Sequence, residues 1–425
     1  MPVILSGAGI NQLLGVPKLQ FSTGELQAAA VIKLVEDWGV QEQIGAMCFD
    51  TTASNTGIKN GACILIEQKL QKNLLHLACR HHILELLLAC AFKECIGISS
   101  GTDVALFKRF QQQWTFMNKA KYETSTGSKE LSCTLEKEKD SLISFATSFL
   151  SIRQPRDDYR ELLELSLIFL GHTPLRGIRF MAPGAMHHAR WMSKAIYCLK
   201  IWMFKSQFIL TTKEEIGIRT MCIFIVKIYI KVWFTAPNSI TSSSNDLNLL
   251  KQLVNYEHPS ISKVTSKKFK SHLWYLCEEL IAFAFFDPTV SHDMKRKMIC
   301  AMNEKDGFSK IPSKKFQLGE QNVDSLSLDK FVSKHTVNFF DRLQISTKFL
   351  QYDPATWESR DDYSAAFKIV SNIRVVNDNA ELGVALIEEY NSIITKKESQ
   401  KQFLLQVVQD HRRQYPNCDK KLLTA

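Results

Sequence analysis

The sequence predicts a chain of two fold classes, an α/β part followed by a long all-α part. Apolar runs at residues 2–6, 13–17 and 44–49 have the length and composition of short β-strands. Beyond residue 61 the apolar residues recur at helical spacing instead, and from about residue 196 the chain becomes helical and increasingly basic. No internal repeat stands out along the chain.

The first part of the chain is predicted to alternate strands and helices. Ser22 is expected to begin a helix that runs to Trp38, with Glu25 three residues later as in a capping box. The strand at 44–49 follows this helix. Residues 61–92 then carry apolar side chains at helical spacing, which predicts two helices broken near Asn73.

The middle of the chain is predicted to be mainly helical. The polar residues 122–140 are expected to form a surface loop or linker, and residues 142–170 return to an amphipathic helical pattern. Residues 220–236 are the most membrane-like stretch, but Lys227 and Lys231 interrupt it. We therefore expect a buried helix or strand there, and no membrane partner.

A basic segment lies in the predicted helical region, beyond Ser- and Asn-rich punctuation at residues 238–248. Between Ser260 and Phe316 there are 11 Lys and Arg against 6 Asp and Glu, a local excess of 11 − 6 = +5. Lys267, Lys268 and Lys270 form its first cluster. Clustered cations of this kind predict sequence-independent affinity for DNA.

The C-terminal part is expected to return from the helical region. Residues 369–376 are predicted to form a strand or a helix entry, and residues 377–379 to cap a helix over 380–390. Glu381 then lies in the first turn of that helix. A final amphipathic helix is expected to end near Arg412.

Composition limits the class of protein. The 425 residues are 45% hydrophobic, which is enough for a sizeable core in two or three domains. With 53 Lys and Arg against 43 Asp and Glu, the net charge of +10 mildly favours a polyanionic partner. The 11 cysteines follow no repeating frame and no signal peptide is evident, so we expect free thiols and a nuclear or cytoplasmic location.

The first chemical motif is a carboxylate at the end of a strand. Asp50 closes the apolar run at 44–49 and opens a polar loop, where a carboxylate can meet a metal or a substrate. Cys79 and His82 lie three residues apart on one face of the next helical stretch. They are compatible with two zinc ligands, but no second Cys/His pair has the required spacing, so we favour a packing and hydrogen-bonding role.

In order and rough spacing, four motifs resemble those of the hAT-type DDE transposases: Asp50 with its polar loop, Cys79-x-x-His82, Arg190-Trp191-x-Ser193, and Glu381. The resemblance covers nearly the whole chain. It implies an RNase H-like mixed sheet flanked by helices and interrupted by a long helical insertion domain. Residues 1–195 would be the first part of the RNase H-like domain, 196–345 the insertion, and 346–425 the return to the RNase H-like domain with C-terminal helices.

The resemblance also implies what chemistry the ancestor performed. In the family, three carboxylates hold Mg²⁺ ions that activate the attacking oxygen and stabilise the leaving one during phosphodiester transfer. Asp50 matches the second acid and Glu381 the last, although the usual Ser-Glu-Arg context is absent. The first acid and its strand would fall upstream of this sequence, and Glu36 and Asp37 lie on a helix surface instead. We therefore expect a transposase-derived, DNA-binding chain whose ancestral Mg²⁺ site is incomplete and whose catalysis is lost.

Arg190 and Trp191 match a family motif on the substrate side of the site. A cation beside an aromatic plane can hold a backbone phosphate or stack a base. Alternatively, Trp191 anchors the core of the following helix and Arg190 lies at its exposed start.

Two other functions remain open from the sequence. An active metal-dependent transposase or nuclease would require an upstream segment that restores the first acid. A non-catalytic interaction scaffold would instead form a homo-oligomer through the hydrophobic edge left by the missing strand.

Overall fold

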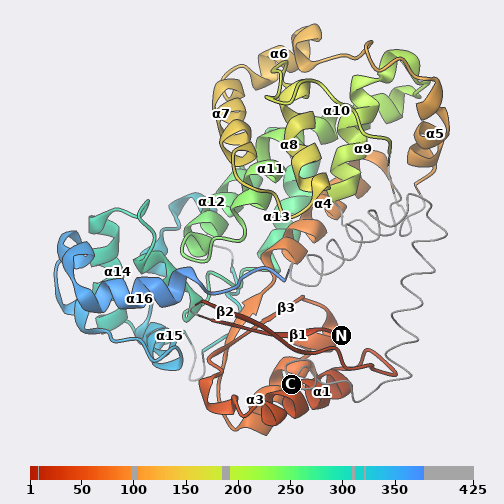
Figure 1. Ribbon diagram of the computed structural model, residues 1–425. Helices are drawn as coiled ribbons and strands as arrows, with labels where there is room; N and C mark the ends of the chain where they lie inside the picture. Colours follow the sequence, from red (N-terminus) through yellow and green to blue (C-terminus); the bar gives the residue numbers. More distant parts are fainter. Residues whose placement is uncertain (8, 98–103, 184–191, 309–311, 320–321, 378–425) are drawn as a thin grey trace. The chain divides into compact units, whose positions relative to one another are not determined.

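The computed structural model describes residues 1–7, 9–97, 104–183, 192–308, 312–319 and 322–377 (Figure 1). All of them belong to one compact unit, Met1–Asn377. The helices predicted beyond residue 377 lie outside the described residues.

The described strands form two separate two-stranded sheets. β1 (Val3–Gly7) and β2 (Ile10–Gly15) make an antiparallel hairpin, whereas β3 (Ala46–Phe49) pairs in parallel with β4 (Leu75–Ala78). The three strands predicted from sequence are confirmed with shifted ends. The expected single mixed sheet is not formed by the described strands, because the hairpin and the parallel pair share no backbone ladder. The fold is mostly helical, with these small sheets at its N-terminal end.

Strand β4 was not expected. Residues 61–92 contain α3 (Ala62–Leu70), β4 and α4 (Arg80–Ile96), rather than two helices broken near Asn73. All four residues of β4 are buried. A strand that is buried on both faces loses the alternation of apolar and polar side chains, so a run this short cannot be distinguished from a helix by periodicity.

Helix α1 (Gly24–Asp37) confirms the predicted helix but begins differently. Thr23 is the N-cap and its hydroxyl accepts a hydrogen bond from the Leu26 amide at 3.4 Å. Ser22 instead accepts from the Gln27 side chain at 3.0 Å, so the predicted capping box is absent. Helix α1 packs on α3 around a small core of Ala28, Ile32, Ala62, Ile66 and Leu74.

The helical part is built from short helices linked mainly by turns and 3-10 segments. They are α5 (Ala105–Gln113), α6 (Lys129–Leu135), α7 (Lys139–Leu150), α8 (Asp157–Phe169), α9 (Met192–Met203), α10 (Thr212–Phe224), a π-helical turn (Ile225–Tyr229), α11 (Ile230–Thr235), α12 (Ser242–Val254), α13 (Pro259–Lys270), α14 (His292–Glu304), α15 (Val337–Arg342) and α16 (Asp361–Ser371).

Two expectations in this region need correction. The polar interval 122–140 is not only loop, because it contains α6, whose Leu131 and Leu135 are buried. The Ser-rich residues 242–244, expected to belong to a break between helices, instead form the buried first turn of α12. Two of their hydroxyls help to explain the difference, since Ser243 donates to the Leu280 carbonyl at 2.9 Å and Ser244 donates to the Asp287 carboxylate, so both remain hydrogen-bonded when buried.

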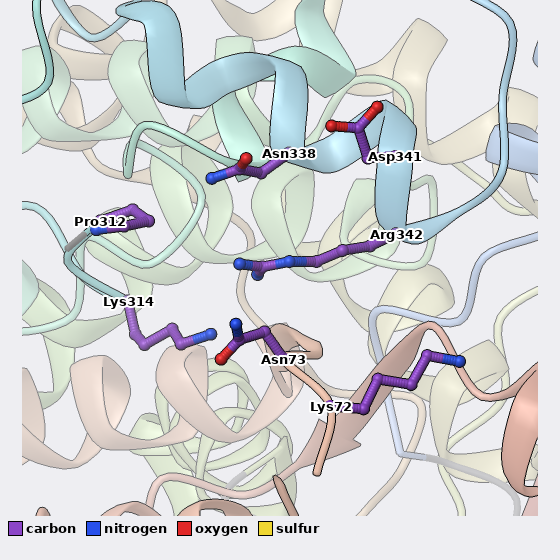
Figure 2. Close-up of a pocket in the computed structure, with 7 residues that line it drawn as sticks. All are labelled: Lys72, Asn73, Pro312, Lys314, Asn338, Asp341 and Arg342. Carbon is purple, nitrogen blue, oxygen red and sulfur yellow. The ribbon is translucent and has the colours of Figure 1, made fainter. Parts of the chain in front are cut away.

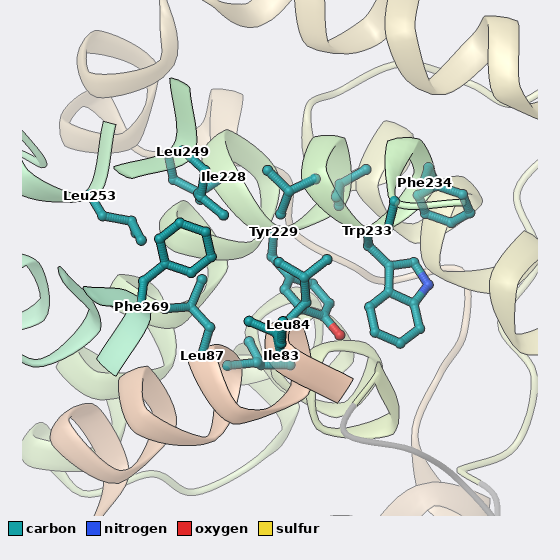
Figure 3. Packing of buried hydrophobic residues seen from close by; sticks show 14 of the residues in the cluster. Ile83, Leu84, Leu87, Ile228, Tyr229, Trp233, Phe234, Leu249, Leu253 and Phe269 are labelled. Atoms are coloured by element: carbon teal, nitrogen blue, oxygen red, sulfur yellow. The ribbon is translucent and has the colours of Figure 1, made fainter. Parts of the chain in front are cut away.

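The main core surrounds α4, which packs on α13 and α10. Figure 3 shows Ile83, Leu84 and Leu87 of α4 facing aromatic side chains from the π-helical turn, α11 and α13. Residues 220–236 supply Tyr229 and Trp233 to this core, which confirms that the stretch is buried. Within the described ranges, none of the helices has the length and apolar character needed to cross a bilayer.

Candidate functional site

Asp50 directly follows β3, as predicted, and its carboxylate organises the next turn. One oxygen, Oδ1, accepts hydrogen bonds from the Thr52 amide (3.0 Å), the Thr52 hydroxyl (2.5 Å) and the Asn55 side chain (2.8 Å). Partial burial by itself raises the pKa of Asp50, but these hydrogen bonds and the nearby His82 outweigh it, and the pKa is lowered. The side chain is therefore a carboxylate at neutral pH.

The residue that follows β4 lies beside this strand end. The Cys79 amide donates to the Phe49 carbonyl at 2.7 Å, because the carboxyl ends of two parallel strands lie at the same edge. Buried Cys79 also accepts a hydrogen bond at its Sγ from the Asn377 amide, 3.2 Å away. The Arg80 amide donates to the Val375 carbonyl at 2.9 Å.

These contacts position the segment Val375–Asn377 at the end of β4. The Tyr275 hydroxyl adds a bond of 2.8 Å to the Ala78 carbonyl and one of 3.5 Å to the Val375 carbonyl. The last described residue of the chain therefore lies at the strand edge that carries Asp50. Glu381 itself lies outside the described residues.

Arg80 and His81 fix the start of α4 to the helical part, and sequence reasoning missed this role. The Arg80 guanidinium pairs with Asp246 at 2.6 Å and donates to the Ala236 carbonyl at 3.1 Å, and both side chains are buried. The His81 ring stacks on Trp233 with ring centroids 3.9 Å apart. The available signal was a cation and a histidine inside an otherwise apolar helical run.

A second group of cations surrounds His272, on the loop after α13. Burial is the main reason that the pKa of His272 is lowered to about 4, and the charges of Lys268, Lys315 and His82 lower it further. His82 acts on Asp50 as well. His82 of α4, Lys268 of α13 and Lys315 therefore all influence His272, and His82 also influences the Asp50 carboxylate.

An aromatic row links the same groups by packing. Phe49, the last residue of β3, meets Trp274 edge to face with centroids 5.9 Å apart. The Lys315 ammonium lies over the Trp274 ring, 5.7 Å from its centroid. The Trp274 ring thus holds Lys315 near the end of β3 through a cation–π contact rather than through an ion pair within the row.

The predicted basic cluster lies in the last turn of α13. Lys267 and Lys270 are exposed and Lys268 is half-buried, while Phe269 between them enters the core. Three cations at a helix C-terminus interact favourably with the helix dipole and keep their charges toward solvent. Helix α13 thus presents lysines next to His272.

The described residues do not assemble a metal centre. In the ranges given above, no group of three or more His, Cys, Asp and Glu side chains has the geometry to hold a metal ion. Asp50 brings one carboxylate, one oxygen of which already accepts three hydrogen bonds, and its titratable neighbour His82 is a poor ligand for Mg²⁺. These residues alone do not fit a two-Mg²⁺ site.

Cys79 and His82, which we expected to serve packing and hydrogen bonding rather than zinc binding, lie in different environments. Cys79 is buried and bonded to Asn377, whereas the His82 side chain is 25% exposed and lies 3.8 Å from Glu85. Cys90, the next cysteine along the chain, donates to the Val264 carbonyl at 3.4 Å. The predicted substrate-side residues Arg190 and Trp191, and the neighbouring His187 and His188, lie outside the described residues.

Comparison with known proteins adds no family assignment, since no protein-family model, curated protein or solved structure matches the chain.

Proposed function

We propose that this chain is a nucleic-acid-binding protein derived from a hAT-type DDE transposase, and that it no longer transfers phosphodiesters. One observation carries the proposal: Trp274 packs on Phe49 at the end of β3 and carries Lys315 over its ring, and Lys315, Lys268 and His82 all act on His272. Cations that come from separate elements and lie near one another are suited to a polyanionic backbone.

The cations contribute to binding in different ways. Lys267 and Lys270 are exposed and free to follow a phosphate backbone, which gives affinity without sequence preference. Lys315 is oriented by Trp274, so it loses less conformational entropy when it meets a phosphate. His272 is neutral near pH 7 and offers a hydrogen bond rather than a charge.

The position of residues 375–377 supports descent from a site with two distant acids. Their hydrogen bonds to Cys79 and Arg80 bring the chain to the Asp50 edge four residues before Glu381. We propose loss of catalysis because the four described strands, VILSG, INQLLG, AMCF and LHLA, contain no Asp or Glu that could join Asp50, which follows β3. Two-metal chemistry depends on carboxylates that bridge both ions.

The salt dependence of DNA binding tests the proposal. Replacing Lys267, Lys268 and Lys270 by Gln should weaken binding to a duplex, because fewer DNA phosphates are then neutralised by the protein. The slope of log affinity against log salt should flatten by about one for each phosphate that is no longer neutralised. Fluorescence anisotropy at several salt concentrations measures both the affinity and the slope.

The control removes the same charge elsewhere. Lys129, Lys137 and Lys213 are exposed lysines on or beside α6 and α10, and their replacement by Gln should leave the slope as in the original chain. If the two triple variants have equal salt-dependence slopes, the α13 lysines are not part of the DNA-binding surface.

A second candidate function is a protein-interaction scaffold that forms a homo-oligomer. It is favoured by large apolar side chains that remain exposed between β2 and the end of α1: Leu13, Val16, Phe21, Leu26 and Trp38. Light scattering at low and high salt would distinguish it, because apolar association persists at high salt whereas DNA binding weakens.

A further inference from the structure

A cavity of about 510 Å³, drawn in Figure 2, is lined in part by residues that precede β4, so it lies at the opposite end of the β3–β4 pair from Asp50. It is lined by Lys72, Asn73, Pro312, Lys314, Asn338, Asp341 and Arg342. Asn73 precedes β4, whereas Asp50 follows β3, and the two strands run in parallel. At ~3.3 Å per strand residue, the four-residue strands that separate the two sites span about 13 Å.

Two cations of the cavity wall are held in place by carboxylates behind it. The Arg342 guanidinium pairs with Glu279 at 2.6 Å, and Glu279 is 1% exposed. The Lys314 ammonium pairs with Glu67 at 3.1 Å. Both cations also donate to the Leu74 carbonyl, at 3.2 Å from Arg342 and 3.0 Å from Lys314.

This arrangement orders both cations and leaves N–H donors of Arg342 unused, whereas the Lys314 ammonium also lies 3.8 Å from Glu279. A guanidinium carries more N–H groups than the two contacts of Arg342 occupy, and the side-chain amides of Asn73 and Asn338 add further donors. Figure 2 shows Arg342, Lys314, Asn73 and Asn338 around one space. Because Glu67 and Glu279 offset much of the positive charge, recognition of an anion would rest on ordered hydrogen bonds more than on net charge.

We propose that this cavity binds the phosphate group of a small molecule, with Arg342, Lys314 and Asn338 as donors. A planar guanidinium matches two phosphate oxygens at once, and the volume suits a mononucleotide-sized ligand. Asp341, the one carboxylate of the wall, would accept a hydrogen bond from a ligand hydroxyl or amino group. The inference does not rest on the DNA-binding proposal, because it uses residues at the other end of the strands.

Two isosteric variants with opposite charge changes test the proposal. Asn338→Asp adds a carboxylate to the wall, and Asp341→Asn removes one, while both leave the buried Glu67 and Glu279 pairs intact. Isothermal titration calorimetry of the full chain with inorganic phosphate, and separately with AMP, measures affinity. We expect Asn338→Asp to weaken binding by ~10-fold or more and Asp341→Asn to strengthen it.

Matched controls carry the same changes at exposed sites away from the cavity. Asn238→Asp and Asp140→Asn should bind phosphate as the original chain does. Absence of binding at millimolar phosphate, or equal affinity in Asn338→Asp and Asn238→Asp, would overturn the site. If duplex DNA displaces bound AMP, the cavity is not a small-molecule site. If AMP still binds after Lys267, Lys268 and Lys270 are replaced, this site is distinct from the DNA-binding surface.

Discussion

At the scale of single residues, the buried pair of Arg80 and Asp246 joins the strand end to the helical part. Burial raises the pKa of Asp246, and the Arg80 charge only partly opposes this. A pair of this kind adds little net stability compared with apolar residues, but removing one partner leaves an uncompensated charge. The pair therefore fixes which elements meet at the start of α4.

Replacing Arg80 by Leu should lower the free energy of unfolding by ~3–5 kcal/mol near pH 7. Because the folded-state pKa of Asp246 is raised, and rises further without Arg80, the folded state takes up a proton more readily than the unfolded state. The penalty should therefore be smallest at acidic pH and grow as pH rises through that folded-state pKa. Urea unfolding at several pH values measures this.

Two controls make the Arg80 experiment specific. Adding Asp246→Asn should recover part of the lost stability, since the buried charge disappears. Arg219→Leu, which breaks an exposed pair with Glu130, should cost no more than about 1 kcal/mol. Equal losses for Arg80→Leu and Arg219→Leu would show that burial of the first pair does not matter energetically.

His272 reports on the cations proposed to contact DNA. Its pKa of about 4 reflects burial first and the charges of Lys268, Lys315 and His82 second. Lys268→Gln should raise this pKa, whereas Lys270→Gln, which removes a charge from the same turn but not from this group, should not. NMR of selectively labelled histidine follows the titration. If the pKa of His272 is the same in both variants, Lys268 does not lie beside His272.

At the scale of elements, local sequence predicted helix α1 and strand β3 correctly but not strand β4. Helix α1 has an apolar face of its own, and β3 ends in a recognisable acid and polar turn. Strand β4 has only four buried residues, and its pairing partner lies across α3. Its conformation is decided by hydrogen bonds to β3, which no local pattern encodes.

The start of α1 lies against the turn after Asp50, so its packing can be tested at Gly24. A Cβ there would clash with backbone atoms of Ser54, Asn60 and Ala62, which cannot rotate away as a side chain could. Gly24→Ala should destabilise the chain by ~1–3 kcal/mol despite the better helix propensity of Ala. Gly127→Ala, where the added group meets nothing within 4 Å, is the control and should be near neutral. Thermal unfolding measures both, and a neutral Gly24→Ala would contradict this packing.

At the scale of the whole molecule, binding and catalysis make different demands. Binding of a polyanion needs only cations near one another, which α13, α4 and the segment at Lys315 supply. Phosphodiester transfer needs several carboxylates held within a small tolerance. The described residues supply cations for polyanion binding, whereas phosphodiester transfer would need metal ligands in addition to Asp50.

We therefore expect no nicking or strand transfer by the purified chain with Mg²⁺ or Mn²⁺. Electrostatic stabilisation of the phosphorane-like transition state weakens when a bridging carboxylate is absent. A supercoiled-plasmid nicking assay decides this, with Asp50→Asn as the control for contaminating nuclease. Activity that Asp50→Asn abolishes would mean that another residue completes the site and that the chain is an active enzyme.

The sequence by itself determined the position of Asp50 after a strand, the order of an N-terminal strand-containing part before a long helical one, and the basic cluster of α13. These features are local, because they depend on periodicity, turn residues and charge along a few neighbouring positions. Only the tertiary structure decided that Arg80 pairs with Asp246, that residues 375–377 return to Cys79, and that Ser243 and Ser244 are buried. Each of these joins residues far apart in the chain, or buries a polar group whose partner no local pattern names, so the partners are selected by packing and desolvation.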